Sequence, residues 1–364
     1  MKTLSVGCTI GILGGGQLGR MTAMAAAQLG CHTHIFCSDK TEPAVEVAGT
    51  VTLASFDDEA ALTRFAQTVD VVTLEWENVP LRALEIVLRK APVFPGSSVL
   101  EVAQDRGQEK RFARQNDIGT ADFEIVHSEA ELEAAMKRFS LPAILKSTRM
   151  GYDGKGQVRL DPGIKAKDAW QEMGAEEGIV ESFVDFECEI SVIVARREDG
   201  VMEAFPPVRN EHKNHILART LWPAVLHPDI EDEAVKLAKR MADKLGVVGL
   251  LAVEMFVLKR PNEKGQRVLM NEIAPRPHNS GHWTMDACAC SQYEQLVRAI
   301  CGWPLGDVTP HSQAEMINLL GDDVNMVPRY LAQEGACVHL YGKAKVRSGR
   351  KMGHVTLLER SSKK

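Results

Sequence analysis

Residues 250–273 read LLAVEMFVLKRPNEKGQRVLMNEI, and this stretch constrains the fold more than any other. Two apolar runs, at residues 250–258 and 267–273, flank a turn-forming segment at residues 261–265. This pattern predicts a β-hairpin. If the hairpin is centred on Glu263, Glu254 lies opposite Glu272 on one face, because strand side chains alternate. The same register pairs Phe256 with Met270 and Leu258 with Val268.

Two opposed carboxylates in an apolar hairpin repel each other, so the pair needs a compensating cation. Carboxylate oxygens suit Mg²⁺, which usually keeps water and phosphate oxygens as its other ligands. We therefore predict that Glu254 and Glu272 bind Mg²⁺. Two alternatives stay open: a register that differs by one residue, and an arginine that neutralises the pair.

A second chemical signal lies about a hundred residues earlier. Lys146 ends an apolar strand predicted at residues 143–146, and residues 150–157 then read MGYDGKGQ. Backbone amides in such a glycine-rich loop can wrap phosphates, and lysines add positive charge. The loop is not the nucleotide-binding P-loop, because Lys155 is not followed by Ser or Thr. Together with the opposed acids, it indicates a magnesium–phosphate site.

The N-terminal segment carries a different glycine motif. An apolar strand at residues 9–13 precedes Gly14, Gly16 and Gly19, which spell GxGxxG, and a helix is predicted at residues 17–29. Asp39 follows the next predicted strand, at the place of a ribose-binding acid in dinucleotide-binding folds. Three interpretations stay open here: a nicotinamide dehydrogenase, a site for another phosphorylated ligand, and a tight turn that only packs helix on strand.

Strands and helices alternate through the first hundred residues, which predicts a parallel sheet with helices on both faces. A strand at residues 69–74 ends at Glu75. Ligands of such sheets bind at the carboxyl ends of strands, so Glu75 is a candidate contact for a sugar or amine. The alternative is a solvated loop.

Beyond residue 105 the pattern changes, with a charged helix at 101–116, strands at 179–184 and 187–195, and a helix at 230–245.

A basic cluster lies near the C-terminus. It consists of Lys343, Lys345, Arg347, Arg350 and Lys351. Arginine and lysine side chains of this kind can clamp a phosphate. The alternative is a solvated surface turn.

Composition limits the class of protein. The chain has 364 residues, 45% of them hydrophobic, and a net charge of −6. These values predict a soluble protein of two or three domains and argue against collagen, coiled coil and disorder. They also argue against a general nucleic-acid-binding protein. The longest apolar run, residues 247–253, falls short of the roughly 20 residues that cross a membrane. Eight cysteines without a CxxC pair predict reduced core thiols in a cytoplasmic protein.

Several motifs together resemble the ATP-grasp ligases and, among them, the 5-(carboxyamino)imidazole ribonucleotide synthetase (PurK) family. They are ILGGGQLG (12–19), TLEWENVP (73–80), GYDGKGQ (151–157), NEIAPRPH (271–278), NSGHW (279–283), YGK (341–343) and GRKMGH (349–354). The motifs span nearly the whole chain in the order of that family. Their joint occurrence is specific, although each motif alone is not.

The resemblance implies an α/β protein, α+β in its centre, with three domains. These are a Rossmann-like preATP-grasp domain at residues 1–105, an ATP-grasp domain at 106–305 with a lid at about 120–185, and a small C-terminal β domain at 306–364. It implies carboxylation of 5-aminoimidazole ribonucleotide by bicarbonate, with ATP, Mg²⁺ and a carboxyphosphate intermediate, in de novo purine synthesis. It also implies a homodimer.

The resemblance carries roles onto individual residues. The implied nucleotide contacts are Arg106, Lys146, Gly151, Tyr152, Asp153, Gly154, Lys155, Gly156, Gln157, Glu181, Ser182, Phe183, Val184, Glu189, His212, Asn271 and Glu272. The implied ribonucleotide contacts are Gly16, Gln17, Leu18, Glu75, Asn279, Lys343, Arg350 and Lys351. The implied magnesium ligands are Glu254 and Glu272, and the implied catalytic residues are Lys146, Asp153 and Arg276. A polar surface histidine is the alternative for His212, and a turn-forming aspartate is the alternative for Asp153.

The GxGxxG turn then serves the substrate ribonucleotide, and Asp39 has no role. One position departs from many ATP-grasp ligases, which carry Asn two residues after the second metal acid, where this chain has Ala274. The nearest competing relative is the formate-dependent glycinamide ribonucleotide transformylase. Asn279 and the sequence GHW at 281–283 favour the carboxylating family. A dehydrogenase and a non-catalytic nucleotide-binding protein stay open as alternatives outside the ligases.

Overall fold

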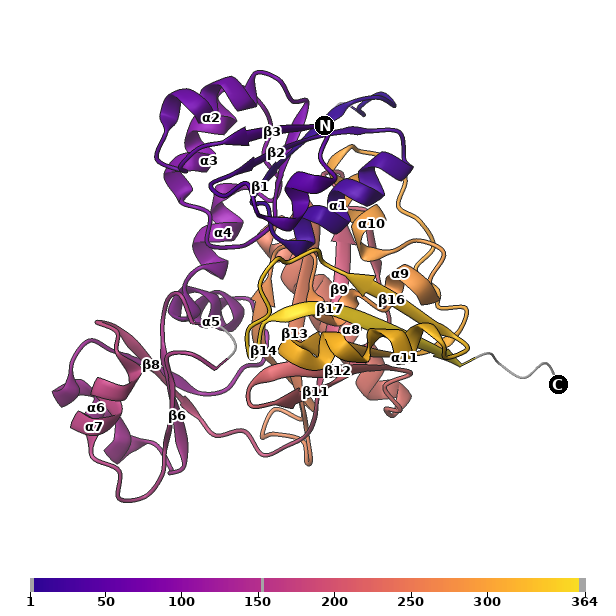
Figure 1. The fold of residues 1–364 in the computed structure, drawn as a ribbon. Coiled ribbons are helices and arrows are strands. Elements are labelled where there is room, and N and C mark those ends of the chain that lie inside the picture. Colours follow the sequence, from indigo (N-terminus) through magenta and orange to yellow (C-terminus); the bar gives the residue numbers. More distant parts are fainter. Residues whose placement is uncertain (1–2, 152–153, 360–364) are drawn as a thin grey trace.

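The computed structural model describes residues 3–151 and 154–359, and its strands form three sheets (Figure 1). One sheet belongs to the N-terminal part, one to a lobe that stands apart from the rest, and one runs through the centre. The α/β class with an α+β centre is therefore confirmed.

The N-terminal sheet is the predicted parallel sheet. Its strand order is β3-β2-β1-β4. The strands are β1 (Thr9–Leu13), β2 (His32–Cys37), β3 (Thr50–Leu53) and β4 (Val71–Leu74). The helices are α1 (Gln17–Gln28), η1 (Pro43–Glu46), α2 (Glu59–Ala66), α3 (Leu81–Leu88) and α4 (Ser97–Ala103). Glu75 donates its backbone N–H to Leu13 at 2.9 Å, so the ends of β1 and β4 lie side by side.

The single charged helix predicted at residues 101–116 is wrong, because the structure has two helices there. α4 ends at Ala103, and α5 spans Arg106–Gln115. Asp105 has extended backbone between them, and its carboxylate accepts the N–H of Gln108 at 2.9 Å. This is an N-cap, which starts a new helix. It places Arg106 in the first turn of α5.

The second sheet forms the lobe, with strand order β5-β8-β6-β7. All its pairs are antiparallel. Its elements are β5 (Phe123–Val126), α6 (Glu129–Arg138), β6 (Ala143–Ser147), β7 (Gln157–Leu160), α7 (Ala166–Met173) and β8 (Gly178–Ser182). The strand predicted at residues 179–184 thus ends early, and Phe183 and Val184 lie in the connection to the central sheet. The lobe occupies the range predicted for a lid, and its movement stays a prediction.

The central sheet has the order β14-β13-β9-β11-β12-β15-β17-β16, with β10 beside β9. Its strands are β9 (Phe186–Arg196), β10 (Met202–Ala204), β11 (Val208–Lys213), β12 (Ile216–Trp222), β13 (Gly249–Leu258), β14 (Val268–Ala274), β15 (Gln313–Leu320), β16 (Ala336–Leu340) and β17 (Lys351–Glu359). The accompanying helices are α8 (Pro228–Leu245), η2 (Asn279–Gly281), α9 (Thr284–Ala287), α10 (Gln292–Ile300), η3 (Gly321–Met326) and α11 (Val327–Leu331). β15 pairs with β12, so the C-terminal strands extend this sheet. The predicted domain boundaries stay predictions.

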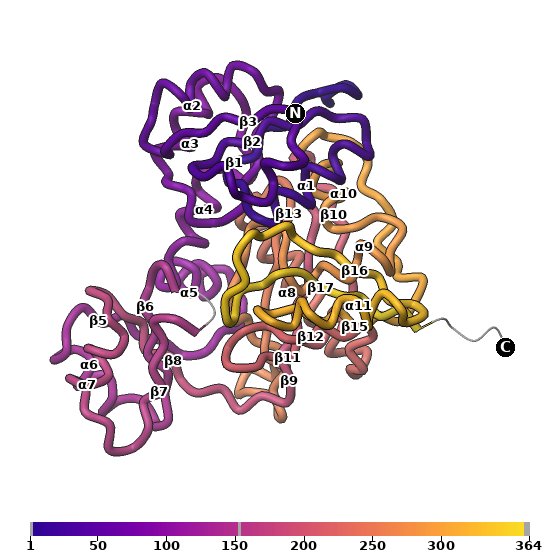
Figure 2. Tube along the Cα trace, in the orientation of Figure 1, coloured from indigo at the N-terminus to yellow at the C-terminus, as the bar shows by residue number. Residues whose placement is uncertain are grey.

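Packing between α1 and α10 holds the N-terminal sheet against the central part (Figure 2). Leu18, Met21 and Ala25 of α1 form a buried cluster with Tyr293 of α10 and Tyr341. All eight cysteines are free and seven are buried, in agreement with the predicted core thiols. Among the described helices, none is both long and apolar enough to span a bilayer.

Candidate active site

A cavity of about 1210 Å³ is lined by residues from all three sheets. Its walls come from the β1–α1 turn, the end of β4, the start of α5, the lobe and the β13–β14 hairpin. Predicted site residues that line it are Gln17, Leu18, Glu75, Arg106, Lys146, Gly151, Gly154, Gln157, Glu181, Ser182, Phe183, Val184, Glu189, His212, Glu254, Asn271, Glu272, Arg276, Asn279 and Lys351.

The β13–β14 hairpin pairs Glu254 with Glu272, as predicted. Beyond this pair the register shifts by one, because Asn271 forms a β-bulge in which two residues of β14 oppose one of β13. The bulge brings both Asn271 and Glu272 to the cavity wall. The predicted pairs Phe256–Met270 and Leu258–Val268 are therefore wrong, and the structure pairs Phe256 with Leu269 and Val257 with Val268.

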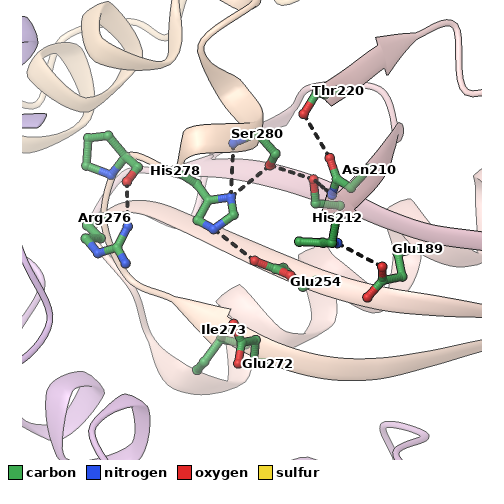
Figure 3. A network of polar contacts seen from close by, with 12 residues as sticks. Glu189, Asn210, His212, Thr220, Glu254, Glu272, Ile273, Arg276, His278 and Ser280 are labelled. Carbon is green, nitrogen blue, oxygen red and sulfur yellow. Dashed lines mark hydrogen bonds and ion pairs between the residues drawn. The ribbon is translucent and has the colours of Figure 1, made fainter. Parts of the chain in front are cut away.

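A basic side chain of the protein faces each of the two acids. Arg106 Nη1 lies 2.7 Å from Glu272 Oε2. His278 Nε2 lies 3.0 Å from Glu254 Oε1 (Figure 3). Burial would raise the pKa of Glu272, but the charge and hydrogen bond of Arg106 hold it below its ordinary value. The arginine considered as an alternative to a metal is thus present beside Glu272.

The residues also fit a hard cation. Asn271 Oδ1 is buried and has no hydrogen-bond partner among the described residues. Together with the carboxylates of Glu254 and Glu272, it forms a set of oxygen donors of the kind that Mg²⁺ prefers.

A buried charge network joins α5, the lobe and β14. Lys146 Nζ lies 2.7 Å from Glu181 Oε2, and Lys110 Nζ lies 3.5 Å from Glu181 Oε1. Lys110 also donates to the carbonyl of Asn271 at 2.6 Å. Burial would raise the pKa of Glu181, but the two lysines outweigh it and lower that pKa to about 2.

The sequence did not indicate Lys110 or its neighbour Glu109, because both lie in a run of charged residues that is typical of an exposed helix face. Glu109 is buried, and its Oε2 accepts the N–H of Ile273 at 3.1 Å. Burial raises the pKa of Glu109 to about 8, although Lys110 and Arg106 oppose the shift. The contact ties α5 to β14 next to Glu272.

The glycine-rich loop reaches the cavity with Gly151, Gly154 and Gln157. Gly154 has φ +78°, and a Cβ there would lie 2.5 Å from Cβ of His215, at the tip of the β11–β12 hairpin. Only glycine allows this close approach. Gly156 has φ +68° and packs on Ser147, and neither it nor Lys155 belongs to the wall. Tyr152 and Asp153 lie outside the described residues.

The strand connection from the lobe leads to Glu189 on β9. His212 of β11 faces Glu189, with Nδ1 2.8 Å from Oε2 (Figure 3). Burial would lower the pKa of His212, but the hydrogen bond and charge of Glu189 raise it. Both residues line the cavity, but His212 is exposed, so the polar surface histidine considered as its alternative stays open. His215 and Asn214 line the same wall, and sequence reasoning missed both.

The opposite end of the cavity contains the residues predicted for a ribonucleotide. Glu75 Oε1 accepts the N–H of Leu18 at 3.3 Å, and a Cβ at Gly16 would lie 2.2 Å from the same oxygen. The glycine turn therefore wraps a carboxylate at the start of α1. Burial raises the pKa of Glu75 to about 6, against the opposing charge of Arg276.

Arg276 forms a half-buried ion pair with Glu77 through Nε and Oε2, and its Nη2 lies 3.0 Å from Oε1. Burial would lower the pKa of Arg276, but Glu77 raises it, so the guanidinium stays charged. Nearby, both polar atoms of the Asn279 side chain are buried without a hydrogen-bond partner among the described residues. An asparagine of this kind is poised to bind a polar ligand.

The C-terminal basic cluster reaches the cavity only through Lys351. Lys343 Nζ lies 5.6 Å from the ring centre of Tyr341. Arg350 Nη1 donates to the carbonyl of Lys345 at 2.7 Å, within the same loop. The structure therefore does not bring Lys343 and Arg350 to the wall with Lys351.

Family comparisons divide the chain into three matched segments. The ribonucleotide synthetase preATP-grasp domain matches residues 8–104, and the ATP-grasp domain matches residues 111–293. The phosphoribosylaminoimidazole carboxylase C-terminal domain matches residues 314–364. The first match favours the ribonucleotide interpretation of the glycine turn over the dinucleotide one.

Relatives resemble the chain over nearly its full length. The N5-carboxyaminoimidazole ribonucleotide synthase of Brucella melitensis is 45% identical, covering 98% of both chains. That of Bacillus subtilis is 40% identical, covering 97% of this chain and 92% of the relative. The bifunctional purine synthesis protein purC/E of Dictyostelium discoideum is 47% identical, but this chain spans only 37% of its length.

Solved structures agree with these matches. The ADP complex of an N5-carboxyaminoimidazole ribonucleotide synthetase is 41% identical with a TM-score of 0.93, over 98% of this chain and 93% of that one. The Aspergillus clavatus synthase with ADP and 5-aminoimidazole ribonucleotide is 28% identical with a TM-score of 0.90, over 97% and 94%. The chain belongs to the N5-carboxyaminoimidazole ribonucleotide synthase (PurK) family of ATP-grasp ligases.

Proposed function

We propose that this chain uses ATP to carboxylate the exocyclic amine of 5-aminoimidazole ribonucleotide, with bicarbonate as the carbon source, in de novo purine synthesis. The products are N5-carboxyaminoimidazole ribonucleotide, ADP and phosphate. One observation carries the proposal: the acidic hairpin with its lysine network and the glycine turn with Glu75 open into the same cavity. A nucleotide and a ribonucleotide can therefore meet there.

The nucleotide side binds ATP. Lys146 and Arg106 face the phosphates, and the glycine-rich loop contributes Gly151 and Gly154 beside them. Glu189 accepts hydrogen bonds from the ribose. Glu254, Glu272 and Asn271 would hold Mg²⁺, which when bound would neutralise charge on the phosphate oxygens. Phosphoryl transfer needs mainly positioning and charge stabilisation, and both lysine and arginine supply these here.

The reaction has two parts. An oxygen of bicarbonate attacks the γ-phosphorus, the bond to ADP breaks, and carboxyphosphate forms. Carboxyphosphate then releases phosphate and carbon dioxide, and the amine of the ribonucleotide attacks that carbon dioxide. Arg276 remains charged and orients the bicarbonate or carboxyphosphate, while Asp153 orients the amine or accepts its proton. Closure of the lobe keeps water from carboxyphosphate.

The ribonucleotide lies over the glycine turn. Its base and sugar contact Gly16, Gln17, Leu18 and Glu75. The buried side-chain amide of Asn279 forms its hydrogen bonds with the bound ribonucleotide. Lys343, Arg350 and Lys351 bind its phosphate, so we expect the loop at residues 341–350 to turn toward the cavity on binding. We further propose that the protein is cytoplasmic and forms a homodimer. Light scattering, which measures molar mass in solution, tests the dimer.

The proposal is tested by ADP release from the purified protein with Mg²⁺, ATP and bicarbonate. We expect strong stimulation by 5-aminoimidazole ribonucleotide and none by glycinamide ribonucleotide with formate. Stimulation by the second pair instead would assign the transformylase reaction. Absence of stimulation by either, in protein that binds ATP, would require a different acceptor.

A further inference from the structure

Two histidines and an aspartate that do not line the cavity meet where the C-terminal strands pack on α9 (Figure 1). His339 of β16 pairs with His354 of β17, and their rings stack with centres 4.6 Å apart. Asp286 of α9 places both carboxylate oxygens 3.0 Å from His339 Nε2. One potential ligand atom from each of the three residues lies within 4.8 Å of the others.

A second observation that points to a ligand is a buried ring nitrogen of His354 without a hydrogen-bond partner among the described residues. The His354 ring is fully buried, and its Nδ1 shares a hydrogen bond of 2.9 Å with the hydroxyl of Tyr341. Its Nε2 is buried with no hydrogen-bond partner among the described residues.

The geometry suits a borderline divalent ion. Nitrogen and carboxylate ligands lie about 2.1 Å from Zn²⁺, so tetrahedral neighbours are about 3.4 Å apart. The 3.0 Å between His339 and Asp286 is close to that value, and a ligand atom at the outer limit of 4.8 Å would need to move closer by about 1.4 Å. In the tautomer that leaves Nε2 of His354 free to bind a metal ion, Nδ1 donates to the hydroxyl of Tyr341, and an outer contact of this kind orients a metal-binding histidine. His339 is 26% exposed, which opens a path from solvent.

We propose that Asp286, His339 and His354 bind a Zn²⁺-class divalent ion. The two histidines flank the loop at residues 341–350, so the ion fastens the base of this loop to α9. Lys351, next to the loop, faces the active-site cavity. The site is separate from Glu254 and Glu272 and does not rest on the proposed function.

Cobalt binding tests the site in the full chain after removal of metals with a chelator. Co²⁺ is the probe because tetrahedral nitrogen ligands give it a visible absorption that a six-oxygen site gives only weakly. We expect about one equivalent to bind with this absorption in the wild type, in Glu272→Gln and in His311→Ala, whose histidine is exposed. His339→Ala should lose the absorption, and Asp286→Asn should bind at least tenfold more weakly.

A second measurement guards against variants that fold poorly. Zn²⁺ should raise the unfolding temperature of the wild type and of Glu272→Gln, but not that of Asp286→Asn. The proposal is overturned if wild-type protein shows no tetrahedral absorption, if His339→Ala retains it, or if Glu272→Gln loses it. The last outcome would place the cobalt at the acidic hairpin.

Discussion

Replacing Lys110 by methionine tests whether the buried charge network holds the nucleotide side of the cavity together. Lys110 is 1% exposed and connects α5 to two other elements. Its Nζ pairs with Glu181 of β8 and donates to the carbonyl of Asn271 in the β14 bulge. Methionine keeps much of the volume and removes the charge. Of the two lysines that pair with Glu181, Lys146 then remains, at 2.7 Å, and Arg106 still acts on the carboxylate through its charge.

The size of the effect follows from this geometry. Breaking a buried ion pair by removing one partner costs about 3–5 kcal/mol, because the remaining charge is left uncompensated. Lys146 still compensates Glu181 in part, so we expect a loss of about 3 kcal/mol, at the lower end of that range. The pKa of Glu181 should rise from its value of about 2, since one of the two lysines that lower it is gone.

Urea unfolding of Lys110→Met and wild type measures the loss, with Lys137→Met as a control. Lys137 pairs with Glu133 at 2.8 Å on the surface, where solvent screens such a pair and its contribution to stability is small. The double variant Lys110→Met/Glu181→Gln should be less destabilised than the two single losses predict together. A loss as small as that of the control, or strict additivity, would refute the network.

Three further outcomes are expected. Gly16→Ala should raise the KM for the ribonucleotide about tenfold or more but leave the KM for ATP unchanged, because the new Cβ would lie 2.2 Å from Glu75 Oε1. Steady-state kinetics measures both constants. The control variant Gly96→Ala should change neither, since a Cβ there meets nothing within 4 Å. Glu75, with its pKa raised from 4.5 to about 6, stabilises the fold below pH 4.5 and loses this contribution as the pH rises through about 6. Glu75→Gln should therefore gain stability relative to wild type between pH 4.5 and 7, and equal melting profiles would contradict the shift. Glu272→Gln should lose about a hundredfold or more of turnover at saturating Mg²⁺, whereas a near-wild-type rate would exclude its metal role.

Much of the fold could be predicted because its strands and helices follow from local patterns of apolar and polar residues. The alternation of strand and helix through β1–β4 and the carboxylate at the end of β4 follow from hydrophobic periodicity and sheet topology. The pairing of Glu254 with Glu272 followed from the hairpin alone. The bulge at Asn271 could not be predicted, because it depends on the fit between β14 and α5, including the contact of Lys110 with the Asn271 carbonyl.

Long-range contacts set the limit for the site. Lys110 and Glu109 are buried only because Glu181 and Ile273, distant in sequence, pack against them. A charged helix gives no sign of this, since its residue types suit an exposed face equally well. In the same way, Asp286 and His339 meet through the packing of β16 on α9 rather than through any motif.

The central claim is that carbon from bicarbonate reaches the ribonucleotide amine at the expense of ATP. NMR with ¹³C-bicarbonate, Mg²⁺, ATP and 5-aminoimidazole ribonucleotide follows this transfer directly. We expect a carbamate carbon signal that grows with ADP in equal amounts, is absent without ATP, and forms about a hundredfold or more slowly with Glu272→Gln. ADP formation without a carbamate signal, or a signal of equal size without ATP, would contradict it.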